Sequence, residues 1–347
     1  MTGIKRDSLQ TQLLALVRQQ HGDDSSVRGL RVMEDGHAGL TYGFELLTGK
    51  NASAQGFVLK LGPPGVVRRG STDIFRQAGL LKVLHEARLP VPRIAWASAD
   101  EDTLGAPYIV MEQLAGRTFV VWEPHETFTQ DNAGIRELWL QAAAALAGFH
   151  QLDWKAHLGN WEAPSSLSAE LGRWTRLLRH APDPSWLEAG QRLSKDLSRL
   201  QPDESSVGLV HGDYQPGNVL YERGRLTGII DWDLACIAPQ GIDLGWLLMM
   251  SDGEAWAAGW KPEAPINRAD LLGAYHQAGG PAHQDLEWYQ AFAHFRMGAI
   301  ACLNVKLHRD GRRPDALWER FVPSIPTLFS RAEALLVQQA SFTGQST

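Results

Sequence analysis

The chain has 347 residues, enough for two lobes that each enclose a hydrophobic core. Its 33 basic and 39 acidic residues give a net charge of −6, which argues against nucleic acid or an anionic membrane as the main partner. Two cysteines imply no disulfide framework, and no apolar run approaches the roughly 20 residues of a membrane span. Because the N-terminus shows no signal-peptide pattern, we expect a cytoplasmic protein.

The N-terminal third combines helical and strand-like patterns. Proline cannot continue a helix, so Pro90 and Pro92 end the second helical pattern. We expect an N-terminal lobe of residues 1–113 and a C-terminal lobe of residues 114–347, with the boundary shortly after a strand at 108–111. The expected elements are a helix at 8–20, strands at 40–47 and 57–61, a helix at 73–87 and a strand at 108–111.

Most of the remaining chain has the periodicity of helices. Pro323 and Pro326 mark a break near the C-terminus. A strand-rich first lobe followed by a mainly helical second lobe predicts an α+β fold of two lobes. The expected helices cover 135–152, 167–180, 185–200, 242–250, 269–277, 286–307, 315–321 and 327–337.

A predicted hairpin lies in the second half of the chain. Residues 209–233 read LVHGDYQPGNVLYERGRLTGIIDWD, and the β-branched and aromatic runs at 219–222 and 226–230 predict two strands. Gly224-Arg225 between them suits a two-residue turn with glycine at the first central position. This turn would fix the pairing register of the two strands.

Polar side chains gather at the open end of this hairpin. The register places Asn218 opposite Asp231, and Asp213 reaches the same end from the loop before the first strand. Two carboxylates and one amide are oxygen ligands that suit a hard cation such as Mg²⁺. The alternative is a hairpin whose polar ends are merely solvated.

The spacing of these residues has a chemical interpretation. An aspartate, an asparagine five residues later and a second aspartate after a hairpin form the catalytic arrangement of kinase-type phosphoryl transfer. In that arrangement Asp213 accepts the proton of the attacking hydroxyl. Asn218 and Asp231 hold the Mg²⁺ that bridges the phosphates of ATP or GTP.

The motif H-G-D-x-x-x-x-N with I-I-D-W-D resembles the aminoglycoside phosphotransferase-like family of small-molecule kinases. The resemblance implies a two-lobed, protein-kinase-like fold. It implies that His211 braces the catalytic loop, with metal ligation as the minor alternative, and that Asp243 anchors the start of a helix as a cap. Asp233 follows the expected strand end at Asp231, so we expect it to brace a loop rather than to bind the metal.

The N-terminal lobe supplies two further parts of a nucleotide site. Gly36, Gly39 and Thr41 belong to a glycine-rich turn that resembles the family's phosphate-covering loop, although an ordinary glycine hairpin is the alternative. Lys60 lies between apolar residues on a predicted strand, at the place of the lysine that contacts the α- and β-phosphates. The alternative for Lys60 is a lysine whose ammonium group is in solvent.

One position departs from the family pattern. Gln77 stands where the family has a glutamate that pairs with the lysine, so it could hydrogen-bond Lys60 without neutralising it, and Asp73 could substitute. The resemblance also places a hinge at 112–114. Its backbone groups, from Glu112, Gln113 and Leu114, would face the purine of the nucleotide.

The acceptor is less constrained. Residues 288–297 resemble the F-x-x-F-R helix of a kinase domain attached to some acyl-CoA dehydrogenases, which implies a hydroxyacyl-type or other metabolite, with an aminoglycoside as the alternative. Clustered basic residues could hold an anionic handle such as a coenzyme A phosphate, or could be solvated surface charge. These residues are Arg68, Arg69, Arg76, Lys306, Arg309, Arg312 and Arg313.

Two other functions fit parts of the pattern. A non-catalytic nucleotide-binding module would explain Gln77 but not the presence of the complete set of base and metal-site residues. A metal-dependent phosphoesterase could use His211, Asp213 and Asp231, but it leaves Lys60 and the hinge unexplained. We therefore expect a kinase that uses Mg²⁺ and ATP or GTP to phosphorylate a hydroxyl of a small molecule.

Overall fold

The computed structural model describes residues 6–33, 40–49, 53–62, 70–128, 131–203 and 206–343. The chain divides into two compact units. The first consists of Met1–Gly116 with Thr227–Leu234, and the second consists of Arg117–Leu226 with Ala235–Thr347. The short segment that carries Asp231 and Asp233 is therefore part of the first unit. Among the described residues, no helix is both long and apolar enough to span a membrane.

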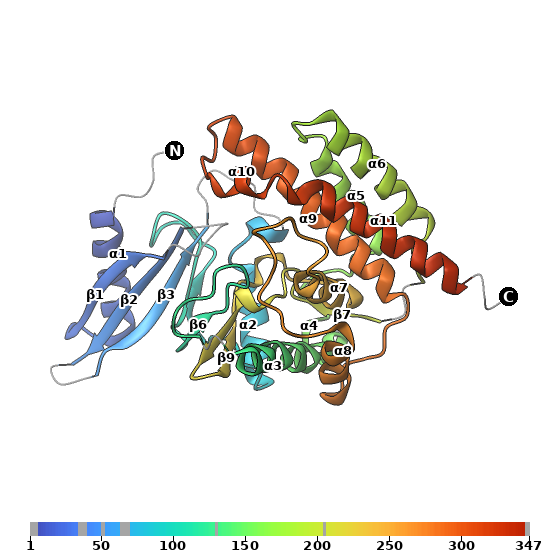
Figure 1. Cartoon of the computed structure of the whole chain (residues 1–347). Helices are drawn as coiled ribbons and strands as arrows, with labels where there is room; N and C mark the ends of the chain where they lie inside the picture. Colours follow the sequence, from blue (N-terminus) through green and yellow to red (C-terminus); the bar gives the residue numbers. More distant parts are fainter. Residues whose placement is uncertain are drawn as a thin grey trace. The chain divides into compact units, whose positions relative to one another are not determined.

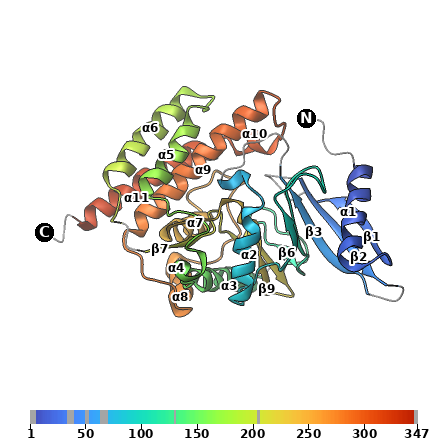
Figure 2. The ribbon, with the colours of Figure 1, turned by 180° about the vertical axis from the view of Figure 1, so that it is seen from behind.

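A five-stranded antiparallel sheet forms the first unit, with the strand order β1-β2-β3-β5-β4. The helix α1 lies against β1 (Figures 1 and 2), and α2 contacts β4. The bounds of these elements are α1 (Arg6–His21), β1 (Ser25–Val32), β2 (Leu40–Thr48), β3 (Gln55–Leu61), α2 (Arg76–Glu86), β4 (Ile94–Ser98) and β5 (Tyr108–Glu112), with a short 3-10 helix at Gly70–Thr72.

The alternation of side chains along β3 explains how this unit is packed. Phe57, Leu59 and Leu61 share one face and are buried in the core beneath α1. The helix supplies four buried residues at the spacing of one helical face, which are Leu9, Leu13, Leu16 and Val17. Lys60 lies between Leu59 and Leu61 and therefore points to the opposite face of the sheet.

The second unit is mainly helical, and α9 is its central element. This helix packs on α5, α6, α7, α10 and α11, and Figure 1 shows it in orange alongside the red α11. Every residue of 241–250 is buried, so α7 is enclosed on all sides. The bounds are α3 (Asn132–His150), α4 (Trp154–Leu158), α5 (Leu167–Leu178), α6 (Pro184–Arg199), α7 (Gly241–Ser251), α8 (Arg268–Gln277), α9 (Leu286–Arg309), α10 (Leu317–Phe321) and α11 (Ser324–Thr343).

Short strands frame the loop that carries Asp213. The strand β7 (Val207–Val210) pairs antiparallel with β10 (Cys236–Pro239) and ends directly before His211. A second sheet has the order β6-β8-β9, formed by β6 (Arg117–Thr118), β8 (Val219–Glu222) and β9 (Arg225–Ile229). Short 3-10 helices cover Pro216–Asn218 and Trp232–Leu234.

The turn between β8 and β9 is centred one residue earlier than predicted. Arg223 and Gly224 have positive φ angles of 52° and 75°, the signature of a type I′ turn. The predicted turn at Gly224-Arg225 is therefore wrong. The register that set Asn218 opposite Asp231 rested on that turn and no longer holds, because β9 already ends at Ile229.

The predicted break before the last helix is only partly correct. Pro323 directly precedes α11, as expected. Pro326, however, lies inside the first turn of that helix. Proline is tolerated there because the first backbone N–H groups of a helix have no partner within it.

Candidate active site

In the first unit, the Lys60 ammonium group is buried beside two carboxylates. Lys60 is only 8% exposed, so the alternative of a solvated lysine is wrong. Its Nζ donates a hydrogen bond to Asp233 Oδ1 and lies 3.4 Å from Asp231 Oδ1. Asp233 is itself buried, whereas the Asp231 side chain is 36% exposed. The sequence D-W-D thus brings two acids to one lysine.

Burial and charge act in opposite directions on Lys60. Burial by itself lowers the pKa of Lys60, but the carboxylates of Asp233 and Asp231 outweigh it and raise the pKa above its ordinary value. The ammonium group therefore stays charged at neutral pH. Asp231 has a left-handed backbone with φ 63°, a conformation that costs a non-glycine residue about 1–2 kcal/mol. Such strain is typical of functional positions.

Gln77 contacts the partner of Lys60 instead of Lys60 itself. Its Nε2 donates to Asp233 Oδ1 at 2.6 Å, and Arg76 Nη2 donates to the Asp233 carbonyl at 2.9 Å. Asp73 accepts a hydrogen bond from the backbone N–H of Phe75. Asp233, which we predicted to brace a loop, therefore provides the negative charge that Gln77 lacks.

In the second unit, residues that follow Asp213 in the chain hold its carboxylate. Asp213 Oδ1 accepts a hydrogen bond from Gln215 Nε2 at 3.1 Å, and its Oδ2 accepts one from Asn218 Nδ2 at 3.0 Å. Asn218 Nδ2 also donates to the Asp213 carbonyl at 2.8 Å. Because the amide N–H groups of Asn218 are directed to Asp213, its Oδ1 is the atom that can serve a cation.

Asp243 braces this loop from the first turn of α7. Its Oδ2 accepts from the backbone N–H of His211 at 2.6 Å, and its Oδ1 accepts from that of Gly212 at 2.8 Å. The predicted helix cap is wrong, because the N-cap residue is Gln240 and no side chain caps α7. His211 is fully buried, and its Nδ1 accepts from the Asp213 N–H at 3.2 Å. These contacts fit the bracing role expected of His211.

A buried polar chain leads away from Asp243. His150 Nε2 lies 3.4 Å from Asp243 Oδ2, His150 Nδ1 lies 2.7 Å from the Tyr275 hydroxyl, and that hydroxyl lies 3.2 Å from His283 Nε2. Burial lowers the pKa of His150, so its ring is neutral. A neutral ring that donates to the carboxylate through Nε2 must accept from Tyr275 through Nδ1. Tyr275 then accepts from His283.

Arg296 is the arginine of the F-x-x-F-R pattern, to which the sequence assigns no role, and it contacts the same loop. Arg296 is 2% exposed on α9, and its Nη2 donates to the Gly212 carbonyl. The available signal is an arginine inside the apolar run 291–302, since arginine is almost never fully buried without a partner. Asp213 thus lies in a loop whose backbone is held by buried side chains from α7 and α9.

Comparisons with known proteins place this chain in a family. Residues 44–292 match the phosphotransferase enzyme family, APH. The chain belongs to this family. It is 26% identical over 300 residues to Arabidopsis thaliana IBR3, which is named as an acyl-CoA dehydrogenase, and this match covers 78% of the chain but only 35% of IBR3. The chain thus spans about a third of that relative's length.

Solved structures of APH proteins share the fold. A Ralstonia eutropha protein assigned as an aminoglycoside phosphotransferase superposes with a TM-score of 0.73 at 22% identity, over 93% of this chain and 98% of the other. A thermostable aminoglycoside phosphotransferase variant, in ternary complex with AMP-PNP and hygromycin B, gives a TM-score of 0.59 at 15% identity, over 94% and 98%. The predicted α+β, two-lobed, kinase-like fold is confirmed.

The two residues predicted to bind the metal, one in each unit, carry donor atoms that suit a divalent cation. The Asn218 amide oxygen and the Asp231 carboxylate are hard oxygen ligands of the kind that Mg²⁺ prefers. Asp231 keeps part of its side chain exposed while Asp233 is committed to Lys60 and Gln77. Asp231 is therefore the better suited of the two acids to take a ligand.

The predicted APH nucleotide loop and hinge are only partly within the described residues. Gly36 and Gly39 lie outside them. Thr41 lies opposite Lys60 in the pairing of β2 with β3. Its hydroxyl is buried without a hydrogen-bond partner among the described residues. In the hinge, the Glu112 and Gln113 N–H groups donate to the Arg93 and Gly56 carbonyls, which leaves Leu114 as the remaining predicted donor.

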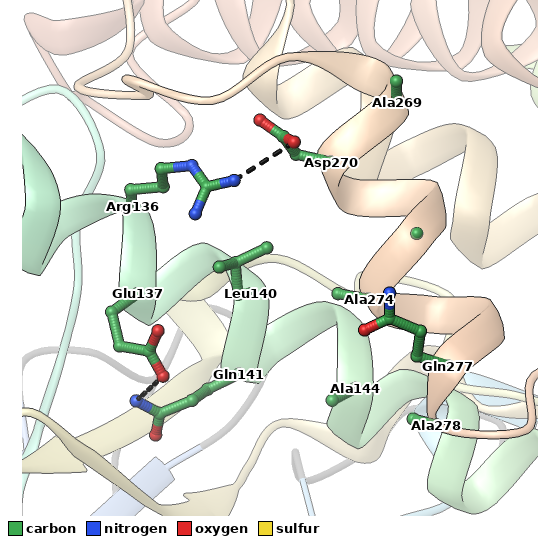
Figure 3. Close-up of a pocket in the computed structure, with 11 residues that line it drawn as sticks. Arg136, Glu137, Leu140, Gln141, Ala144, Ala269, Asp270, Ala274, Gln277 and Ala278 are labelled. Atoms are coloured by element: carbon green, nitrogen blue, oxygen red, sulfur yellow. Dashed lines mark hydrogen bonds and ion pairs between the residues drawn. The ribbon is translucent and has the colours of Figure 1, made fainter.

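A separate groove of about 670 Å³ lies between α3 and α8. Small residues such as Ala144, Gly273 and Ala274 line it, and an Arg136–Asp270 ion pair of 3.1 Å bridges the two helices (Figure 3). None of its lining residues belongs to the predicted site. This groove is therefore no part of the phosphotransfer machinery that the sequence predicts.

The basic residues considered for an anionic handle are in part already paired. Arg309 binds both carboxylate oxygens of Glu319, at 2.6 and 2.9 Å, and Lys306 lies 3.9 Å from Asp310. Arg76 is engaged with the Asp233 carbonyl. Arg68 and Arg69 lie outside the described residues. The pairing of Arg309 and Lys306 favours ordinary surface charge over a phosphate site at this end of α9.

Proposed function

We propose that the protein is a Mg²⁺-dependent kinase that transfers the γ-phosphoryl group of ATP or GTP to a hydroxyl of a small metabolite. The observation that carries this proposal is the buried Lys60 ammonium group beside Asp231 and Asp233. A solvated hairpin does not require a buried lysine between two acids, whereas kinase-type transfer requires a cation and a metal-binding acid at the phosphates.

The residues of the second unit have complementary roles in this proposal. Asp213 orients the acceptor hydroxyl and takes its proton, and the hydrogen bonds from Gln215 and Asn218 fix the direction of its carboxylate. His211 and Asp243 hold the loop backbone so that Asp213 needs little reorganisation during transfer. Positioning of this kind supplies much of the rate enhancement of phosphoryl transfer.

The residues suited to the metal are Asn218 and Asp231. A Mg²⁺ ion held there would neutralise the charge that develops on the phosphate oxygens during transfer. Lys60 would contact the α- and β-phosphates. Gly36, Gly39 and Thr41 would cover those phosphates, and the backbone of Leu114 would meet the purine. Each of these assignments rests on the family motif and on the donor chemistry of the residues.

For the acceptor, we propose a hydroxyacyl compound, with aminoglycosides as the comparison class. The similarity to IBR3 supports this choice, since IBR3 is named as an acyl-CoA dehydrogenase. The match to a hygromycin B complex concerns the fold at 15% identity and favours no acceptor. Acceptor screens should therefore begin with hydroxyacyl-CoA compounds.

Thermal shift with ATP, GTP and ADP, each with and without Mg²⁺, tests the nucleotide site. A ligand at about 100 times its Kd adds about 2.7 kcal/mol of stability. We expect a Mg²⁺-dependent increase in Tm that Asp231→Asn loses and that the exposed control Asp100→Asn keeps. If no nucleotide raises the Tm of the wild-type protein, the kinase proposal fails and the metal-dependent phosphoesterase becomes the function to test.

Asp213→Ala separates catalysis from binding. We expect this variant to lose phosphoryl transfer, because no other side chain takes the hydroxyl proton, while the nucleotide-dependent Tm increase is retained. Turnover is measured as ADP release with a hydroxylated acceptor. Near-normal turnover would remove Asp213 from the mechanism, and nucleotide binding without turnover in the wild type would favour a non-catalytic module.

A further inference from the structure

Arg296 is a buried cation held between two indole rings. Its guanidinium carbon lies 4.2 Å from the ring centre of Trp174 on α5 and 4.5 Å from that of Trp246 on α7. Removing a guanidinium group from water is unfavourable, and each such cation–π contact offsets part of that cost. The two indoles thus fix the plane of the group and offset part of the cost of burying it.

The charge of Arg296 has no carboxylate in direct contact. Among the ion pairs of the described residues, none includes Arg296, and its Nε has no hydrogen-bond partner there. Burial lowers the pKa of Arg296. Nearby acids act in the opposite direction and raise it, Asp213 more than Glu170. The catalytic aspartate is therefore the acid whose charge acts most strongly on this arginine.

Arg296 completes the set of contacts that hold the peptide group before Asp213. The carbonyl of that peptide, from Gly212, accepts from Arg296 Nη2, and its N–H, from Asp213, donates to His211 Nδ1. Gly212 has a φ of 85°, a left-handed conformation that glycine adopts readily. Rotation of this peptide would swing Asp213 away, and Arg296 is the side chain that holds its carbonyl.

We propose that Arg296 is a positioning residue for phosphoryl transfer: by holding the Gly212 carbonyl it fixes the Gly212–Asp213 peptide, and with it the position of the Asp213 side chain. This inference rests on the proposed kinase function.

The chain contains a matched control for Arg296. Arg173 stacks on the same indole, with its guanidinium carbon 4.8 Å from the Trp174 ring centre, but its side chain is 36% exposed and pairs with Glu170 at 3.9 Å. Arg173→Met therefore removes an arginine from Trp174 without touching the catalytic loop. Arg296→Met removes the loop contact and the charge, and Arg296→Lys keeps the charge alone.

The kinetic test compares these variants through ATP hydrolysis in the absence of acceptor and through transfer once an acceptor is known. For Arg296→Met we expect kcat to fall at least tenfold with KM for ATP within twofold of wild type. Arg296→Lys should recover part of kcat, and Arg173→Met should match wild type. An unchanged kcat in Arg296→Met, or equal losses in Arg296→Met and Arg173→Met, would overturn the proposal.

Hydrogen exchange gives an outcome that does not need turnover. In Arg296→Met, the amides of 211–213 should exchange at least tenfold faster, whereas Arg173→Met should leave them unchanged. Unchanged exchange in Arg296→Met overturns the positioning role even if the wild-type protein proves inactive. If Arg296→Met does not fold, both measurements can be made on Arg296→Lys and Trp246→Phe. Each of these variants weakens the contacts of the side chain at position 296 while keeping a cation there.

Discussion

In the surroundings of Lys60, a neighbouring acid compensates for one substitution in the family motif. The family pairs this lysine with a glutamate from the following helix, where this chain has Gln77. The negative charge comes instead from Asp233, two residues after the proposed metal ligand Asp231, and Gln77 donates to that carboxylate. A neutral glutamine suits this arrangement, because a glutamate at position 77 would place a second acid against Asp233.

Removing one member of the Lys60–Asp233 pair should cost more than removing both. Lys60→Met leaves a buried carboxylate without its cation, and we expect the free energy of unfolding to fall by about 3 kcal/mol. The double variant Lys60→Met/Asp233→Asn should recover part of that loss. Urea denaturation measures both values. The exposed pair of Arg93 and Glu112, whose N···O distance is 2.6 Å, provides the control, and Arg93→Met should change stability by less than about 1 kcal/mol.

Gln77→Ala should have a modest effect on nucleotide affinity. It removes one hydrogen bond to Asp233, worth about 1 kcal/mol, but leaves the charges of Lys60 and Asp233 in place. We expect the Kd for ATP to rise about fivefold or less, as measured by titration calorimetry. Gln55→Ala, which removes an exposed hydrogen bond to Glu112, is the control. A complete loss of binding in Gln77→Ala would mean that Gln77 does more than orient Asp233.

At the scale of elements, the sequence predicted the long helices and the three central strands well. The helices were recognisable because apolar residues recur on one face, as with Leu9, Leu13 and Leu16 in α1. The strands β1, β4, β6, β7 and β10 were not predicted. All except the eight-residue β1 have two to five residues, too few for an alternating pattern to stand out.

The site was predictable where chemistry dictates residue type and spacing, and less so where contacts come from distant segments. Asp213 and Asn218 were identified from their five-residue spacing. The contact of Asp243 with the loop and that of Arg296 with Gly212 link residues 31 and 84 positions apart, so no local pattern carries them. The role of Asp243 was mistaken for a cap because an acid in the first turn of a helix is typical of helix starts.

The turn between β8 and β9 offers a test at this scale. Arg223 has a positive φ, a conformation that asparagine tolerates better, so Arg223→Asn should raise stability by about 0.5–1 kcal/mol. Gly224→Ala should lower stability by about 1 kcal/mol for the same backbone reason, although no atom lies within 4 Å of the added Cβ. Thermal denaturation measures both changes.

Gly273 provides the opposite control. It lies in α8 with open space around an added Cβ, so Gly273→Ala should stabilise the protein by about 0.5–1 kcal/mol through helix propensity. A loss of stability in Gly273→Ala, or a gain in Gly224→Ala, would contradict this account of the two glycines.

At the scale of the whole molecule, buried histidines should make stability depend on pH. Burial is the main cause that lowers the pKa of His283 to about 4. The unfolded chain takes up a proton near pH 6.5, while the folded chain does not until about pH 4. Stability should therefore fall as the pH drops through this window, by at most about 1.4 kcal/mol per pH unit from His283.

His283→Gln should reduce this pH dependence. We expect the difference in Tm between pH 7 and pH 5 to shrink in His283→Gln and to remain at the wild-type value in His157→Gln, whose histidine is exposed. Differential scanning fluorimetry across this range gives the comparison. An equal slope in the wild type and in His283→Gln would show that His283 is not a source of acid sensitivity.

The membership of Thr227–Leu234 in the first unit has a consequence for anyone who wishes to express that unit alone. The chain passes from one unit to the other three times, so a clone that stops at Gly116 encodes Lys60 but neither Asp231 nor Asp233. Such a fragment would bury an ammonium group with no acid beside it. A fusion that joins 227–234 to Gly116 through a flexible linker restores both carboxylates and is the smaller piece that we expect to fold and remain in solution.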